Sequence, residues 1–173
     1  MIWEKEFSSR VNSFEAKIPQ RVEGQTLSIK LYGSGCFHRE HSPHAYRMID
    51  KYLNSHPLKD DKVELIEHES GPELLVYLAL GTAAILLSKS ILDLIITIVK
   101  SRQEGIKHGD RHQTVFEIRV RGFDKNGNIK EERIFKFDSL DAVERDIIEK
   151  TLQSAINKFL TKRQKRRKSS SER

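Results

Sequence analysis

Cysteine is almost absent from this chain of 173 residues, because Cys36 is the only one. A single thiol cannot form an intrachain disulfide, and such sequences are typical of reducing compartments. The first residues also lack the basic segment followed by an apolar segment that begins a secretory signal. We therefore expect a cytoplasmic protein.

Motifs of the common enzyme classes are missing as well. We find no serine in a nucleophile elbow, no His-Glu-x-x-His zinc helix and no pair of carboxylates that the pattern would bury together. Cys36 has histidines nearby, as a nucleophile would, but no third group that would orient such a histidine can be identified. We predict that the protein is not an enzyme and needs no cofactor.

Most of the chain carries no excess of one charge. Charged residues make up 32% and apolar residues 37% of the sequence, against averages of about 25% and a little under half, so one modest core is expected. Residues 162–173 hold seven of the 31 Lys and Arg residues and one of the 25 acidic residues, which leaves 24 of each sign in residues 1–161. The formal net charge of +6 therefore belongs to the C-terminal segment.

Apolar periodicity predicts an α+β domain. Residues 25–32 and 62–68 have the pattern of half-buried strands, and Ser42-Pro43 is typical of the start of a helix, expected over 43–55. Strand, helix and strand in this order predict a parallel βαβ unit.

A β-hairpin is predicted around Asn126-Gly127, because both residues tolerate the positive φ angles of a two-residue turn. In the register that this turn sets, apolar pairs fall on one face and opposite charges on the other, as in a ladder with one buried face. The expected pairs are Phe116–Phe137, Glu117–Lys136, Ile118–Phe135, Val120–Arg133 and Arg121–Glu132.

A closing amphipathic helix is expected from Asp138 or Ser139 onward. The fold prediction is thus a four-stranded mixed sheet, made of the βαβ unit and the hairpin, with a long central helix and this closing helix. We divide the chain into an N-terminal amphipathic helix or arm (1–20), one α+β domain (21–161) and a disordered basic tail (162–173). The predicted buried stripe of the closing helix is Leu140, Val143, Ile147, Thr151, Ala155 and Phe159.

The longest apolar segment is predicted as one helix over 72–104. Such a helix is about 50 Å long, whereas a domain of this size is about 30 Å across. Its charge-free part, 74–88, has 15 residues, fewer than the about 20 that a membrane span needs. We therefore expect a homo-oligomer or a protein partner to cover the helix, with membrane association as the alternative. The residues of this predicted seam are Leu74, Leu78, Ile85, Leu92, Ile95, Ile96 and Val99.

Four potential metal ligands lie within nine residues: Cys36, His38, His41 and His44. Thiolate and neutral imidazole are ligands that zinc prefers, and four of them complete a tetrahedral site. They do not form the two distant pairs that are typical of structural zinc, so we predict no metal and favour histidines that cap the helix or bond locally. A small metal-dependent enzyme is the alternative that these residues leave open.

The C-terminal segment is strongly basic. Such runs are typical of solvated tails and of segments that bind nucleic acid or another polyanion. No aromatic residue interrupts this one, so base stacking is absent and any binding should be independent of nucleotide sequence. The basic residues are Lys162, Arg163, Lys165, Arg166, Arg167 and Lys168.

The order of elements has one further implication. A strand and helix come first, then a Gly/Ala/Leu-rich long helix that ends near Lys100 and Arg102, a hairpin with a polar turn, and a closing helix. Over about residues 25–160 this layout resembles the effector-associated constant components of bacterial conflict systems. Segment 1–20 and the basic tail depart from that pattern. The resemblance implies a non-catalytic adaptor in bacterial defence.

We therefore expect a protein-interaction module that self-associates or binds a partner through helix 72–104. A nucleic-acid-binding accessory protein that acts through the basic tail is the first alternative. A membrane-associated component that uses the same apolar helix is the second.

Overall fold

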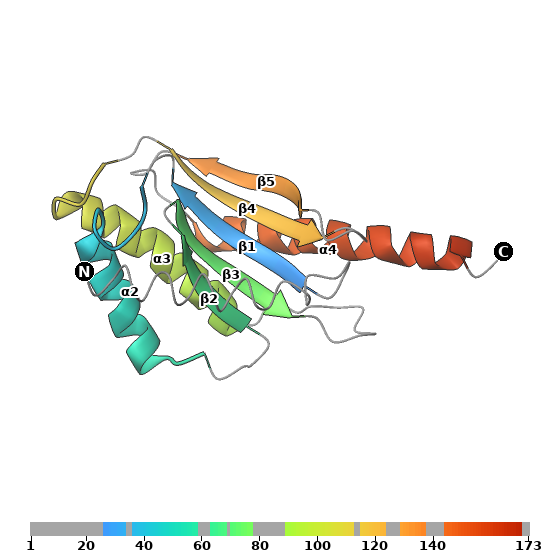
Figure 1. Cartoon of the computed structure of the whole chain (residues 1–173), viewed down its shortest axis with the longest axis horizontal. Coiled ribbons are helices and arrows are strands. Elements are labelled where there is room, and N and C mark those ends of the chain that lie inside the picture. Colours follow the sequence, from blue (N-terminus) through green and yellow to red (C-terminus); the bar gives the residue numbers. More distant parts are fainter. Residues whose placement is uncertain are drawn as a thin grey trace.

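The computed structural model describes residues 26–33, 36–58, 63–68, 70–77, 89–112, 115–123, 129–137 and 144–170. They form a five-stranded sheet with three helices, an α+β arrangement (Figure 1). The N-terminal helix or arm predicted over 1–20 lies outside the described residues. The elements are β1 (Thr26–Gly33), α2 (Pro43–Ser55), β2 (Val63–His68), β3 (Gly71–Tyr77), α3 (Lys89–Lys107), β4 (Phe116–Phe123), β5 (Ile129–Phe137) and α4 (Arg145–Ser170).

One apolar core joins the sheet to the helices. Alternate residues of β1 (Leu27, Ile29 and Leu31) are buried in it, as the period of a strand requires. Helix α3 contributes the longest buried stripe and packs against α2, while α4 packs against β4 and β5. The three helices thus cover the same face of the sheet.

The strand order is β2-β3-β1-β4-β5, and all neighbouring strands are antiparallel. The predicted four-stranded mixed sheet with a parallel βαβ unit is therefore wrong. Because β1 and β2 are both antiparallel to β3, they run in the same direction across α2. They are not neighbours, since β3 lies between them and takes the hydrogen bonds that a parallel pair would share.

The single helix predicted over 72–104 is also wrong, because residues 71–77 form β3 and α3 begins at Lys89. His68 pairs with Gly71, so only two residues connect β2 to β3. Five residues of the predicted seam are buried in the chain's own core and are not available to a second molecule. These five are Leu74, Leu92, Ile95, Ile96 and Val99, and the other two, Leu78 and Ile85, lie outside the described residues. Among the described helices, none is long and apolar enough to cross a membrane.

The β4–β5 hairpin has the predicted register at one end only. The pairs of Phe116, Glu117 and Ile118 with β5 are confirmed. A register shift after Ile118 then leaves Ile134 as an extra residue, a β-bulge. As a result Arg121 lies opposite Glu131 rather than Glu132. The predicted turn at Asn126-Gly127 lies outside the described residues.

Helix α4 differs from its prediction in face and in length. It buries Ile148 and Leu152 together with Ala155 and Ile156, whereas Ile147 is 47% exposed. The predicted stripe is one residue out of phase with the observed one. The adjacent Ile147 and Ile148 fit either stripe, and the stripe that contains more apolar residues faces the sheet. The helix continues to Ser170, so residues 162–170 are helical rather than a disordered tail.

The face of the sheet away from the helices carries a network of charges. Glu73 of β3 is only 3% exposed, accepts a hydrogen bond from Ser28, and pairs with His68 (2.9 Å) and Arg121 (3.4 Å). Arg121 also pairs with Glu131 of β5. The network therefore ties together all five strands. Its other ion pairs are Arg119–Glu117, Arg119–Glu131 and Arg133–Glu117.

Candidate metal centre

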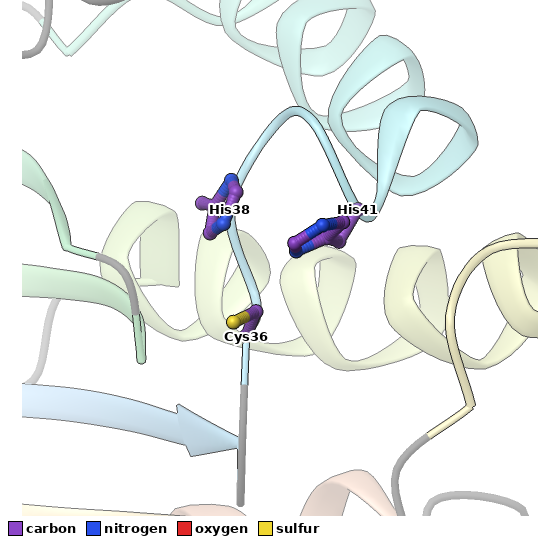
Figure 2. Close-up of side chains that lie close together, drawn as sticks. All are labelled: Cys36, His38 and His41. Atoms are coloured by element: carbon purple, nitrogen blue, oxygen red, sulfur yellow. The ribbon is translucent and has the colours of Figure 1, made fainter.

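Three of the four potential ligands lie together in the loop between β1 and α2. One ligand atom from each of Cys36, His38 and His41 lies within 4.8 Å of the other two. Figure 2 shows the three side chains gathered around one bend of the chain. His38 is buried, while Cys36 and His41 are half-buried, so the group has one side toward solvent. A thiolate and two imidazoles are a donor set for zinc and related soft cations.

The residues between the ligands hold the loop in place. Phe37 is fully buried, and its carbonyl oxygen accepts a hydrogen bond from the hydroxyl of Tyr46 (3.0 Å). Arg39 donates two hydrogen bonds to Asp50 of α2 (2.6 and 2.8 Å) and two to Glu67 of β2 (2.9 and 2.7 Å). Its hydrogen bonds to Asp50 and Glu67 raise the pKa of Arg39. The loop is therefore fixed to both a helix and a strand by a permanent positive charge.

The far end of the loop is held by its backbone. The amide of His41 donates to the carbonyl of His38 (3.2 Å), and the amide of Arg111 donates to the carbonyl of His41 (2.9 Å). The rings of His38 and His41 lie 4.5 Å apart, centroid to centroid. The Nδ1 atom of His41 is buried and has no hydrogen-bond partner within the part of the chain that the structure describes.

His44, the fourth predicted candidate, belongs to a different group. Its Nδ1 lies 2.8 Å from Oδ1 of Asp110, and the same carboxylate accepts the backbone amides of His44 (3.0 Å) and Ala45 (2.9 Å). Asp110 thus caps the N-terminus of α2 from a distant part of the sequence. His108, which the sequence places beside Asp110, stacks loosely on His44, with ring centroids 6.0 Å apart.

Ser42, the predicted cap of α2, has another role. It makes no side-chain capping bond, and its hydroxyl instead accepts a hydrogen bond from Arg102 of α3 (2.8 Å). Arg102 is 1% exposed, donates also to the carbonyl of Arg111 (2.7 Å), and lies over the ring of Phe37. This buried guanidinium connects α3 to both sides of the histidine loop.

Replacing Asp110 by alanine is expected to destabilise the protein by about 2 kcal/mol. The change removes the acceptor of two helix amides, the buried one of Ala45 and the partly buried one of His44, and leaves them without this partner. Urea denaturation followed by circular dichroism measures the loss. His108→Ala, an exposed change nearby, is the control and should leave the midpoint almost unchanged. Equal midpoints for Asp110→Ala and the native chain would contradict the assignment of Asp110 as the cap.

The predicted polyanion-binding residues lie at the other end of the molecule. All six belong to the last part of α4, which extends beyond the sheet toward the C-terminus (Figure 1). The histidine loop lies at the opposite end, next to α2. The two candidate sites are therefore separate.

Comparisons with known proteins add no identification. No protein-family model, no curated protein and no solved structure matches the chain. The resemblance to effector-associated constant components stays a prediction. The long helix from residue 72 that contributed to it is replaced by β3 and α3. Function must therefore be argued from the residues themselves.

Proposed function

We propose that the protein is a non-catalytic binding protein that contacts the phosphate groups of a nucleic acid through the C-terminal end of α4. The observation that carries the proposal is a helix that leaves the body of the molecule with six positive charges in seven residues, 162–168. The cytoplasm is the compartment that we propose with it, because the chain has a single thiol.

The charge of this segment is local. Residues 1–161 hold equal numbers of acidic and basic residues, so no basic surface elsewhere in the chain is needed to account for the net charge. At about 1.5 Å per residue, the six charged residues occupy about two helical turns. DNA carries about one negative charge per 1.7 Å of its axis, so the two charge densities are comparable.

Neutralisation by phosphate also favours the helix itself. Lys162 and Arg166, and likewise Arg163 and Arg167, are four residues apart, where like charges repel. A bound polyanion removes this repulsion. The helix dipole adds a smaller favourable term, because its negative end lies at Ser170, close to the cations.

The other expected functions have less support. An oligomer or partner seam on helix 72–104 loses five of its residues to the core. Among the residues whose burial the structure describes, Ile147 is the exposed large apolar side chain, so those residues form no broad apolar surface. Residues 161–170 contain no apolar side chain, which disfavours insertion of this helix end into a membrane.

Binding of the full chain to a labelled double-stranded DNA of random sequence tests the proposal by fluorescence anisotropy. With about five phosphate contacts, the logarithm of the affinity should fall with the logarithm of the salt concentration at a slope of about −4.5. A fourfold increase in salt should therefore weaken binding about 500-fold. Changing the DNA sequence should have little effect, because contacts to phosphate groups carry no sequence information.

A matched control separates the effect of the basic cluster on DNA binding from the effect of the net charge of the protein. One variant replaces the six basic residues of 162–168 by glutamine, and a second replaces six exposed basic residues elsewhere, so that both have the same net charge. We expect the first variant to lose binding and the second to keep it within about threefold, a change of less than 1 kcal/mol. Similar losses in both variants, or none in the first, would overturn the proposal. The control set is Arg47, Lys51, Lys89, Lys100, Lys130 and Lys150.

A further inference from the structure

We propose that Cys36, His38 and His41 bind one zinc ion, with a fourth coordination position that is open to water. The proposal differs from the sequence-based expectation of no metal. It does not depend on the proposed nucleic-acid binding, since the histidine loop and the basic end of α4 lie at opposite ends of the molecule (Figure 1). Neither site contributes residues to the other.

The distances between the ligand atoms are close to those of a zinc site. Bonds of about 2.3 Å to sulfur and 2.0 Å to nitrogen set ligand atoms about 3.3 to 3.6 Å apart in a tetrahedron. The three atoms lie within 4.8 Å of one another and the side chains lie close together (Figure 2), so we expect rotations of the side chains to close the remaining gap.

The backbone is already fixed in the conformation that presents the ligands. Phe37 and Arg39 alternate with Cys36 and His38 along the loop, and each is anchored, Phe37 in the core and Arg39 to Asp50 and Glu67. Because the anchors and the ligands are different residues, binding a metal breaks none of these contacts. A site held in this way loses little conformational entropy on binding.

The buried Nδ1 of His41 is a second indication. A buried polar atom normally has a hydrogen-bond partner, and its absence costs free energy. No described residue supplies a partner for this nitrogen. We expect the metal ion to bind at this nitrogen and so to replace the missing hydrogen-bond partner.

The donor set selects the metal. Sulfur and imidazole nitrogen favour zinc over magnesium or calcium, which require oxygen ligands. Three protein ligands with an open fourth position are typical of zinc sites that hold a water molecule. His44 is not part of this group of ligand atoms, and its Nδ1 is paired with Asp110.

Titration of the full-length chain with metal tests the site. After treatment with a chelator and desalting, the protein is titrated with Zn²⁺ against a chromophoric competitor, and separately with Co²⁺ while its absorption is recorded. We expect one equivalent of either metal to bind. The cobalt protein should show a thiolate-to-cobalt charge-transfer band and the intense visible bands of a four-coordinate ion.

Small substitutions identify the ligands without disturbing the fold. Cys36→Ser should abolish the charge-transfer band, and His41→Gln should weaken zinc binding at least about tenfold. His44→Ala and the exposed His56→Ala are the controls and should bind zinc like the native chain. Circular dichroism of each metal-free variant verifies that it is folded.

Two results would overturn the proposal. The first is the absence of stoichiometric zinc binding by the native chain. The second is equal binding by the native chain, Cys36→Ser and His41→Gln, which would mean that other surface groups hold the metal. A loss of affinity in His44→Ala equal to that in His41→Gln would overturn the three-ligand assignment with its open position.

Discussion

Replacing Gly71 by alanine is expected to destabilise the protein by about 4 kcal/mol. The φ angle of Gly71 is +129°, a conformation that side chains with a Cβ rarely adopt. A Cβ at this position would also lie 2.0 Å from the carbonyl oxygen of Leu31. Leu31 belongs to the central strand β1, which is hydrogen-bonded on both sides and cannot move away. Chemical denaturation of the two proteins measures the difference.

Two other glycines distinguish the strain of a positive φ angle from the contact of the added Cβ with its neighbours. Gly109 also has a positive φ angle, +100°, but a Cβ there would meet nothing within 4 Å, so Gly109→Ala should cost only about 1 kcal/mol. Gly105 lies in α3, and its Cβ would lie 2.1 Å from Oδ2 of Asp110 and disturb the cap of α2. Equal losses in Gly71→Ala and Gly109→Ala would show that contact with Leu31 contributes nothing.

Acidification should remove about 3 kcal/mol of stability between about pH 5 and pH 2, through protonation of Glu73. Burial alone raises the pKa of this carboxyl, but hydrogen bonds from His68 and Ser28 and the charge of Arg121 outweigh it and lower the pKa from 4.5 to about 2. The unfolded chain therefore binds the proton at a higher pH than the folded chain does. The stabilisation is complete above the pKa that Glu73 has in the unfolded chain. It disappears as the pH falls toward the pKa of Glu73 in the folded chain.

Glu73→Gln tests the origin of this pH dependence. Glutamine keeps the size of the side chain but removes the charge, so the variant should be less stable at pH 7 by about the same amount. Its stability should then change less between pH 5 and pH 2. The control is Glu104→Gln, at an exposed carboxylate paired with Lys107, which should leave the acid profile unchanged. A Glu73→Gln profile parallel to that of the native chain would contradict the prediction.

Elements with a local signal could be predicted from the sequence. β1, α2 and β2 lie within about one residue of their expected bounds, because alternation and the Ser42-Pro43 signal define them. β3 could not be recognised in the same way, since it begins a nearly continuous apolar segment in which strand and helix periods are indistinguishable. The Gly71-Pro72 pair was the available signal, because such dipeptides mark turns.

The candidate site was only partly predictable for a related reason. Cys36, His38 and His41 are close in sequence, and the loop that joins them keeps them close in space. Asp110 and Glu67 act on the same region from distant segments, so no local pattern connects them to it. His44 lies outside the cluster, and its pairing with Asp110 is visible only in the tertiary structure.

The position of β1 at the centre of the sheet has a consequence for how the protein is made. β1 is the first described strand to leave the ribosome, yet its partners β3 and β4 come much later in the chain. The β2–β3 and β4–β5 hairpins are local and close quickly, whereas docking both onto β1 requires long loops to close. During synthesis both edges of β1 stay unpaired until β3 and β4 are made, so this strand needs protection from aggregation until then.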